Sequence, residues 1–537
     1  MDDMYDMYDV AIIGAGVAGG LLARTLAAYD LKICILEKEH DVATGATRAN
    51  SGIAHAGYDA LEGTLKARLN VRGSRMMERL ARELGVPYRR NGSMVIGFGD
   101  EDRETIEKLY ARGVANGVEE LRVIDGEEAR RLEPGLSRAV TCALHAPTGS
   151  IVCPYELAIA AVGNAMDNGA ELFLDFQVGH IEKNQDGYTI SSVCREGRGR
   201  EGDGGKGAVC PGEERDKKAG KEALPETAGN GKDSGEPSPR SVRARYVVNA
   251  AGIYADEIAR LAGDDSIRIH PRRGEYLLLD RACGGLVSHT IFRTPSRQGK
   301  GILITPTVDG NLLLGPTSVD GEDKEDRATT REGLEQIMAR ARENVEALPQ
   351  GKVITSFTGL RAAGNTGDFI IDSPGPGFIN VAGIESPGLT AAPAIAEYVA
   401  EMLAAQGLAL NRKADYQPLR KPVYAFRNAS PEEKNEMIRR DKAYGRVVCR
   451  CETVTEGEIL EAIRRNPPAR DLDGIKRRTR AQMGRCQGGF CMPYLMEILS
   501  RELGIPYEEV TKSDKGSEIN ICRTKACKDF PSPREGE

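Results

Sequence analysis

Four cysteines near the end of the sequence have the residue type and spacing of metal ligands. Cys449 and Cys451 form one close pair, and Cys486 and Cys491 form a second. Thiolates are soft ligands, and four of them suit either a zinc ion or an iron–sulfur cluster. Glycines beside the second pair let the backbone approach such a centre closely. We therefore predict that these residues bind a metal ion or a cluster, and an electron carrier here implies a further redox centre in the chain.

The start of the chain has the glycine pattern of a nucleotide-binding turn. An apolar strand is expected over residues 8–13, glycines follow in the spacing G-x-G-x-x-G, and a helix and a second strand over residues 31–36 come next. The first glycine allows the tight bend, the second admits a pyrophosphate, and the third lets helix and strand pack closely. The helix N-terminus attracts phosphates, and an acid after the second strand binds a ribose. The residues expected at the nucleotide are Gly14, Gly16, Gly19, Glu37 and Lys38.

Length and charge restrict the classes of protein that fit. The chain has 537 residues and a formal net charge of −7, so it can form several domains, and no excess of basic residues indicates a nucleic-acid partner. No apolar run approaches the ~20 residues needed to cross a bilayer. The acidic N-terminus does not resemble a signal peptide. We expect reduced thiols in a cytoplasmic protein, with peripheral attachment to the inner face of the membrane as the alternative.

Three further segments each lead into a turn of small residues. They cover residues 43–57, 246–256 and 379–390, and strand ends of this kind form the ligand crevice of an open α/β sheet. In this order they resemble the D-amino-acid-oxidase-like superfamily of flavoproteins, over residues 7–410 apart from one insertion. The resemblance implies that the cofactor is FAD. It also implies cofactor contacts at Ser51, Gly52, Ala251, Gly252, Gly383, Gly388, Leu389 and Thr390.

The cysteine pattern resembles a known cluster-binding domain. A C-x-C pair followed by a C-x4-C pair is similar to the ligands of bacterioferritin-associated-ferredoxin-like domains, which bind a [2Fe–2S] cluster. Alternating strands expected over residues 88–99 and 301–316 indicate an antiparallel sheet. The predicted fold class is therefore α/β. It combines a Rossmann-like FAD-binding domain, an inserted antiparallel-sheet substrate domain and a small C-terminal helical [2Fe–2S] domain.

We expect the chain to divide as follows. The FAD-binding domain takes residues 7–90, 150–265 and 355–410, the substrate domain 91–149 and 266–354, the cluster domain 430–515, and a flexible tail 516–537. Residues 195–243 are polar and lack aromatic residues, so we expect a disordered, non-catalytic insertion in a hairpin loop. Cys522 and Cys527 in the tail have ligand-like spacing, but without a second pair we expect free thiols.

Within the superfamily, residues 50–57 and 63–68 are similar to two groups. The first is the FAD-dependent glycerol-3-phosphate dehydrogenases of the anaerobic, iron–sulfur-bearing type, and the second is the L-2-hydroxyglutarate oxidases. Ferredoxin-like tails occur in the first group and in some amine-oxidising relatives. The resemblance implies a small anionic hydroxy substrate, hydride transfer to FAD, and electron transfer through the cluster to a redox partner protein or a quinone-linked acceptor.

Oxidation of a secondary alcohol requires a base that takes the hydroxyl proton while a hydride moves to the flavin. His55 is the candidate base, because in relatives its loop lies along the flavin ring; a hydrogen-bonded structural histidine is the alternative. Arg361 matches an arginine that relatives place near substrate and flavin, and its guanidinium suits an anion; a surface ion pair is the alternative. Basic residues on loops are usually solvated, so the weaker candidates for binding the anion are Arg272, Arg273 and Lys66.

Two interpretations of different classes follow. In the first, the chain is a dehydrogenase whose favoured reaction is oxidation of sn-glycerol 3-phosphate to dihydroxyacetone phosphate. The alternative substrates are L-2-hydroxyglutarate and an amine or amino acid. In the second, it is an electron-transfer subunit of a larger flavoprotein complex. An oxidase that forms hydrogen peroxide is a third interpretation, and the sequence favours it less, because a built-in cluster offers the electrons another exit. The sequence favours the first, since the substrate-domain pattern keeps its own arginine.

Overall fold

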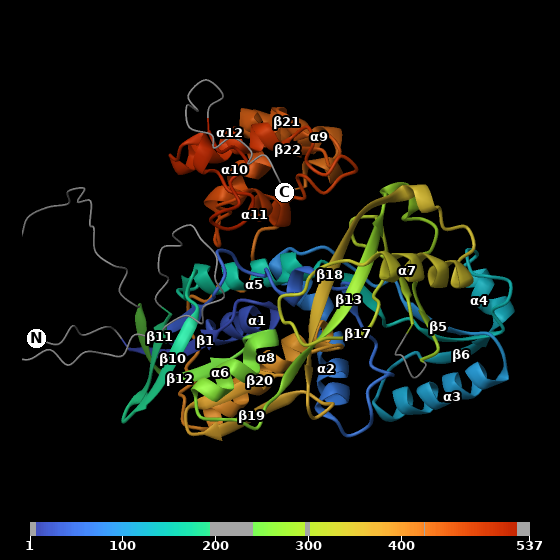
Figure 1. Ribbon diagram of the computed structural model, residues 1–537, viewed down its shortest axis with the longest axis horizontal. Helices are drawn as coiled ribbons and strands as arrows, with labels where there is room; N and C mark the ends of the chain where they lie inside the picture. Colours follow the sequence, from blue (N-terminus) through green and yellow to red (C-terminus); the bar gives the residue numbers. More distant parts are fainter. Residues whose placement is uncertain (1–6, 194–239, 296–300, 424, 523–537) are drawn as a thin grey trace, which may run out of the picture.

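The computed structural model describes residues 7–193, 240–295, 301–423 and 425–522. Figure 1 shows a large α/β body and, on one side of it, a smaller helical domain formed by the last part of the chain. The body contains one largely parallel sheet and one largely antiparallel sheet. This arrangement agrees with the predicted α/β fold class.

The parallel sheet is built around its first strand. β1 lies between β2 and β12, all three are parallel, and β12 also pairs in parallel with β20. Val10 and Ile12 face one apolar cluster, whereas Ala11 and Ile13 face another, so the sheet is buried on both faces. Its strands are β1 (Tyr8–Ile13), β2 (Ile33–Leu36), β9 (Glu171–Phe173), β10 (Val178–Asn184), β11 (Gly187–Ser192), β12 (Ser241–Asn249), β19 (Ile370–Gly375) and β20 (Phe378–Ala382).

The helices of the body divide between its two large sheets: α1 and α6 contact strands of the parallel sheet, whereas α3, α4 and α7 contact strands of the antiparallel one. α1 begins directly after the glycine turn and packs against α5 and α8. α2 and α8 approach so closely that a Cβ on Gly73 would lie 2.0 Å from the carbonyl oxygen of Thr390. In the described part of the chain, none of the helices has the length and apolarity to cross a membrane. The helices are α1 (Val17–Leu26), α2 (Leu65–Leu84), α3 (Asp100–Ala115), α4 (Gly126–Leu132), α5 (Pro154–Asp167), α6 (Ala255–Leu261), α7 (Arg331–Asn344) and α8 (Gly388–Ala405).

The second sheet is antiparallel except where β14 and β5 run parallel. Its two longest strands, β13 and β18, lie side by side along their whole length (Figure 1). The strands are β5 (Ser93–Gly97), β6 (Arg122–Asp125), β7 (Cys142–Ala146), β13 (Ile269–Leu279), β14 (Thr290–Arg293), β15 (Leu303–Pro306), β16 (Leu312–Gly315), β17 (Val319–Asp320) and β18 (Val353–Gly364). A small third sheet joins β3 (Ile53–Ala54), β4 (Tyr88–Arg89) and β8 (Ser150–Val152).

Strand pairing differs from the expected division at two points. Residues 355–364 were expected in the FAD-binding domain, but they lie in β18, which pairs with β13 in the antiparallel sheet. The insertion expected over 195–243 extends too far, because β12 begins at Ser241 and pairs with β11. Positions 195–239 lie outside the described residues. The rest of the division stays a prediction.

The C-terminal domain has its own apolar core. Ile459, Leu472, Ile475, Leu495 and Leu499 are all fully buried within it. Its elements are α9 (Pro431–Arg440), β21 (Val447–Cys449), β22 (Val454–Thr455), α10 (Glu456–Arg464), α11 (Leu472–Thr479) and α12 (Met492–Leu503). The helical character of this domain matches the prediction.

The expected flexible tail includes residues with fixed partners. Glu518 forms a β-bridge with Thr511. Cys522 is disulfide-bonded, so the expectation of a free thiol is wrong for this residue, because a cysteine pair can close a loop without binding a metal. Cys527 lies outside the described residues.

A buried ion pair connects the C-terminal domain to the body. Asp41, in the loop after β2, accepts hydrogen bonds from Arg478 at 2.7 and 2.8 Å and a further one from Arg477. All three side chains are at most 5% exposed. Removing one partner of such a buried pair typically costs about 3–5 kcal/mol, because the other charge is left unpaired. The contact therefore fixes α11 against the body.

One histidine of the antiparallel sheet lies among groups that disfavour its protonation. His145 on β7 is buried, its ring centroid lies 5.4 Å from that of His289, and Nη2 of Arg122 lies 3.3 Å from its Nδ1. Burial and then the nearby His289 and Arg122 lower the pKa of His145 to about 4. The folded protein therefore binds this proton less readily than the unfolded chain does.

We predict that His145→Gln reduces the loss of stability on acidification. Between about pH 6.5 and pH 4 the unfolded chain binds a proton at His145 that the folded protein excludes, so stability falls as pH falls. The measurement is the urea midpoint of unfolding at pH 7 and pH 5. The exposed His180 on β10 provides a control, His180→Gln, that should keep the wild-type dependence. An unchanged acid sensitivity in His145→Gln would contradict the assignment.

Candidate functional site

A cavity of about 1940 Å³ lies between the two large sheets. Its wall includes the glycine turn after β1, the loop over residues 44–51, and parts of β13 and β18. The predicted site residues that line it are Gly14, Gly16, Glu37, Lys38, Ser51, His55, Ala251, Gly252, Arg361, Gly388 and Leu389. The structure therefore brings together, in one cavity, predicted residues that lie as far apart in the sequence as Gly14 and Leu389.

The glycine turn has the geometry that a pyrophosphate needs. Gly14 has a φ of 108°, and a Cβ there would lie 2.5 Å from the carbonyl oxygen of Ala250, so a larger residue does not fit. A Cβ on Gly19 would lie 2.0 Å from the carbonyl oxygen of Gly14. Gly19 thus serves the packing of α1 onto the turn. Gly16, between them, lines the cavity at the N-terminus of α1, and the positive end of a helix dipole attracts anions.

Glu37 follows β2 directly and is held by the backbone. Its Oε2 accepts a hydrogen bond from the N–H of Ala15 at 2.7 Å, and its Oε1 accepts one from the N–H of Glu39 at 3.0 Å. Burial raises the pKa of the Glu37 carboxyl, and the two N–H donors oppose this shift. The acid is fixed at the cavity wall beside the glycine turn, which is the place of the ribose-binding acid in dinucleotide folds.

Beside the predicted Lys38, this end of the cavity has residues that the sequence analysis missed, namely Arg48, Tyr254, Lys324 and Glu325. The Nζ atoms of Lys38 and Lys324 lie 4.0 and 5.5 Å from the centroid of the Tyr254 ring, and the Tyr254 hydroxyl donates to Glu325. Arg48 also lines the cavity, and burial lowers its pKa. Arg48 lies inside a glycine-containing loop and could have been noticed, whereas Lys324 reaches Tyr254 only through the tertiary fold.

Three predicted cofactor residues shape the backbone beside the cavity without lining it. Gly52 has a φ of 66°, and a Cβ there would lie 2.7 Å from the carbonyl oxygen of Val152. Gly383 has a φ of 64°. The hydroxyl of Thr390 accepts a hydrogen bond from the N–H of His55 at 2.8 Å, so the start of α8 holds the loop that carries the candidate base.

His55 and Arg361 lie at the end of the cavity formed by the antiparallel sheet. Nε2 of His55 lies 3.5 Å from the hydroxyl of Ser386, and its ring packs 5.6 Å from that of Phe292. Tyr276, a further residue missed from the sequence, lines the same wall; its hydroxyl lies 3.4 Å from Oγ of Ser51. A tyrosine within a strand gives no local signal of such a role.

Arg361 is held by carbonyl groups. Its Nη2 donates to the carbonyl oxygen of Thr317 at 2.8 Å and to that of Arg273 at 3.4 Å, and its Nε donates to that of Arg272 at 3.3 Å. Burial lowers the pKa of the guanidinium. In the described part of the chain no carboxylate forms an ion pair with Arg361, so its charge is available to an anion in the cavity.

The three weaker cationic candidates have carboxylate partners. The N···O distance is 2.9 Å from Lys66 to Glu385 and 2.7 Å from Arg272 to Asp320. It is 2.6 Å from Arg273 to Asp326. A paired cation has less free charge to offer a substrate. Arg361 is therefore the better anion site of the four.

The four C-terminal cysteines come together as two pairs. The Sγ atoms of Cys451 and Cys486 lie 3.6 Å apart, and Cys491 donates a hydrogen bond to Cys449, which lowers the pKa of Cys449 to about 6 and raises that of Cys491. Cys449 and Cys491 are buried, whereas Cys451 is exposed. The outer pair therefore lies at the surface of the domain.

The surroundings of these thiols fit an iron–sulfur cluster. Backbone N–H groups of Gln482 and Glu452 donate to Cys449, and such donors stabilise thiolate sulfur. A Cβ on Gly484 would lie 2.3 Å from Cβ of Cys451, so the two ligand loops touch. Among the described residues no three His, Cys, Asp or Glu side chains form a group suited to a single ion. Two separate pairs suit a centre with two irons, each of which takes two protein thiolates.

Comparison with known proteins identifies both parts of the chain. Residues 9–402 match the model of the FAD dependent oxidoreductase family. The chain belongs to this family. Residues 447–501 match the BFD-like [2Fe–2S] binding domain. The predicted superfamily and the predicted cofactors, FAD and a [2Fe–2S] cluster, are thereby confirmed.

Individual members of the FAD dependent oxidoreductase family extend this likeness. The chain is 44% identical over 522 residues to the glycerol 3-phosphate dehydrogenase of Caloramator mitchellensis, a match of 97% of this chain and 99% of the relative. It is 31% identical over 344 residues to the mitochondrial L-2-hydroxyglutarate dehydrogenase of Mus musculus, or 63% and 64% of the two chains.

A solved structure of this family shares the fold. The dithionite-reduced L-α-glycerophosphate oxidase from Mycoplasma pneumoniae with FAD bound superimposes with a TM-score of 0.65 at 28% identity, over 78% of this chain and 99% of the oxidase. The roles of individual site residues in this chain stay predictions.

We predict that Glu37→Ala weakens FAD retention without removing the cluster. Loss of a charged hydrogen-bond acceptor typically costs about 1.5–3 kcal/mol, or roughly 10- to 150-fold in affinity. The measurement is FAD occupancy after gel filtration, with iron content determined on the same sample. Glu182→Ala, at an exposed position on β10, is the matched control. Full FAD occupancy in Glu37→Ala would show that this acid does not bind the ribose.

Proposed function

We propose that this FAD-dependent oxidoreductase is a dehydrogenase that oxidises sn-glycerol 3-phosphate to dihydroxyacetone phosphate. Its electrons leave through the [2Fe–2S] cluster to an acceptor other than NAD, such as a redox partner protein or a quinone-linked carrier. We place it in the cytoplasm, with peripheral attachment to the membrane as the alternative.

The observation that carries this proposal is the charge of Arg361. Its guanidinium is largely buried, lines the cavity and donates to three carbonyl oxygens. A buried cation that forms no ion pair with a carboxylate of the described residues favours an anionic ligand, and a guanidinium forms strong, charge-assisted hydrogen bonds with phosphate. A small phosphorylated alcohol satisfies this requirement.

The remaining residues supply the other half of the reaction. FAD, when bound, accepts the hydride from the carbinol carbon of the substrate. The hydroxyl proton then needs an acceptor, and the Nε2 of His55, partly exposed at the cavity wall, is suited to this role. Loss of one hydride and one proton converts the secondary alcohol to a ketone.

The names of the relatives support this choice of substrate. The dehydrogenase from Caloramator mitchellensis matches nearly the whole chain, including the cluster domain, whereas the L-2-hydroxyglutarate dehydrogenase from mouse matches a smaller part. Both substrates are anionic hydroxy compounds, so the choice between them requires a direct test.

We predict that glycerol 3-phosphate bleaches the flavin anaerobically and that Arg361→Ala lowers kcat/KM. Loss of a charge-assisted contact to a buried anion typically costs ~2–4 kcal/mol, or about 30- to 1,000-fold. His55→Ala should slow bleaching with a smaller effect on binding, because a base acts in the transition state. Stopped-flow absorbance measures both effects. Arg331→Ala, at a position 85% exposed, is the control. If 2-hydroxyglutarate or an amino acid bleaches the flavin and glycerol 3-phosphate does not, the proposed substrate is wrong.

We predict that Cys449→Ser or Cys486→Ser leaves flavin bleaching intact but stops reduction of an artificial one-electron acceptor. The wild-type protein should contain about two irons per chain. Metal analysis and steady-state acceptor reduction test this pair of statements. Cys283→Ser, at a buried free cysteine of the body, is the control. Stoichiometric zinc without iron, or full acceptor reduction in both variants, would contradict the proposed route.

A further inference from the structure

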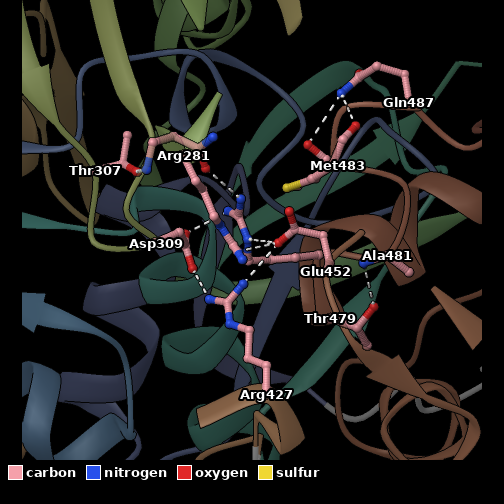
Figure 2. A network of polar contacts seen from close by, with 12 residues as sticks. Arg281, Thr307, Asp309, Arg427, Glu452, Thr479, Ala481, Met483 and Gln487 are labelled. Atoms are coloured by element: carbon pink, nitrogen blue, oxygen red, sulfur yellow. Dashed lines mark hydrogen bonds and ion pairs between the residues drawn. The ribbon is translucent and has the colours of Figure 1, made fainter. Parts of the chain in front are cut away.

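A network of buried charges lies where the cluster domain meets the body. Glu452 is 2% exposed, and its Oε2 accepts hydrogen bonds from Arg281 at 2.5 Å, Arg427 at 2.9 Å and Arg480 at 3.1 Å. Asp309, in the turn between β15 and β16, accepts from Arg427 at 2.5 Å and from Arg480 at 2.6 Å. Figure 2 shows the guanidinium group of Arg427 joined to the carboxylates of both Asp309 and Glu452.

This network is tied to both cluster-ligand pairs. Glu452 directly follows Cys451, and its N–H donates to the sulfur of Cys449. Arg480 has a φ of 68°, a left-handed conformation that turns the chain out of α11 and into the loop that carries Cys486. Arg480 is therefore connected to both ligand loops, through its hydrogen bond to Glu452 and through the chain that follows it.

A short segment of the body reaches from the backbone at Gly52, beside the cofactor cavity, to the same network. The N–H of Val152 donates to the carbonyl oxygen of Gly52 at 2.9 Å. Three positions later, the hydroxyl of Tyr155 lies 3.4 Å from Nη1 of Arg480 and 3.5 Å from Sδ of Met483. A hydroxyl can accept from the guanidinium and donate towards the sulfur at once. Residues 152–155 thus contact the backbone beside the cofactor cavity at one end and Arg480 and Met483, next to the cluster ligands, at the other.

The network also carries excess positive charge. Its three arginines and two carboxylates leave a net charge of 3 − 2 = +1. Glu156 lies close to Asp309 and Arg480, and burial and then Asp309 raise its pKa to about 7, so it adds less than one full negative charge at neutral pH. Reduction of a cluster adds negative charge, and nearby charges and hydrogen bonds set its potential.

We propose that Arg480 is a positioning residue for electron transfer between the two cofactors. Together with Tyr155 it holds both cluster-ligand loops against residues 152–155, and together with Arg427 it provides positive charge that stabilises the reduced cluster. This inference rests on the proposed route of electrons from flavin to cluster. Substrate oxidation delivers two electrons, and a [2Fe–2S] cluster holds one extra electron, so the electrons cross this junction one at a time and a one-electron acceptor removes each from the cluster.

The test uses the holoenzyme and charge-changing variants of one network. Arg480→Gln should lower the reduction potential of the cluster, whereas Asp309→Asn should raise it, since the first removes a positive and the second a negative charge. An anaerobic redox titration followed by electron paramagnetic resonance measures both shifts. Arg464→Gln, at an exposed residue of the same domain paired with Glu502, is the control and should leave the potential unchanged.

The positional part of the proposal is tested separately with Tyr155→Phe. This change keeps the ring and the charges but removes the hydroxyl between Arg480 and Met483. We expect electron transfer from the reduced flavin to the cluster to slow several-fold, with the cluster potential and the rate of substrate bleaching unchanged. Rapid-scan absorbance after photochemical reduction of the flavin measures the transfer without any substrate. If Arg480→Gln fails to retain iron, Arg480→Lys, which keeps the charge but loses the planar fork, should slow transfer at a near-normal potential.

Two results would overturn the proposal. Potential shifts of the same sign in Arg480→Gln and Asp309→Asn would indicate general distortion of the domain and not the charge effect. Wild-type transfer in Tyr155→Phe together with unchanged potentials would show that the network only fixes the domain interface. Because the flavin is reduced photochemically, failure of glycerol 3-phosphate as a substrate leaves this test valid and is recognised by its own bleaching experiment.

Discussion

The buried contacts between arginines and carboxylates at the domain boundary fix the cluster domain against the body. Asp41 is enclosed by Arg477 and Arg478, and Glu452 is enclosed by three further guanidinium groups. A buried charge that loses its partner is costly, so the cluster domain cannot shift without a large loss of stability. Since Asp41 belongs to the loop after β2 and Glu452 follows a cluster ligand, the same contacts position the cofactor cavity and the cluster together.

The cavity follows from a second constraint, which is close backbone approach. The turn at Gly14 passes so near Ala250 that a side chain is excluded, and Gly19 allows α1 to begin directly against that turn. These contacts leave backbone N–H groups at the ends of parallel strands, where an open α/β sheet binds ligands. The antiparallel sheet then closes the opposite side with β13 and β18. A large cofactor and a small anion can share one space because two sheets of different type face each other.

Charge pairing distinguishes the cations around this space. Lys66 and Arg272 both approach Glu385, so their charges are largely balanced within the protein. Arg361 instead donates to carbonyl oxygens from the middle of a strand. The sequence alone does not show which of these cations is paired with a carboxylate. The structure distinguishes them, because the carboxylate partners come from segments far away in the chain.

Local patterns in the sequence, together with the family resemblances that they carry, were sufficient for the cofactors and the main fold class. The predicted first strand, residues 8–13, coincides with β1, and Glu37 directly follows β2, because hydrophobic periodicity, glycine turns and thiol spacing are properties of short segments. The limits of the antiparallel sheet were missed at residues 355–364, because the pairing of β18 with β13 depends on residues about ninety positions away. The disulfide at Cys522 was likewise not visible from spacing.

The sequence by itself determined a nucleotide-binding turn and two thiol pairs suited to a metal centre, because each of these motifs lies within a short segment of the chain. The choice of FAD and a [2Fe–2S] cluster came from the resemblance of these motifs to known families. Only the tertiary structure decided which of the four candidate cations forms no ion pair with a carboxylate of the described residues, which tyrosines line the cavity, and how the cluster domain connects to the body. The network around Glu452 joins residues from Arg281 to Arg480, and burial is what gives these charges their strength. Burial and long-range pairing are properties of the folded chain, and no local pattern encodes them.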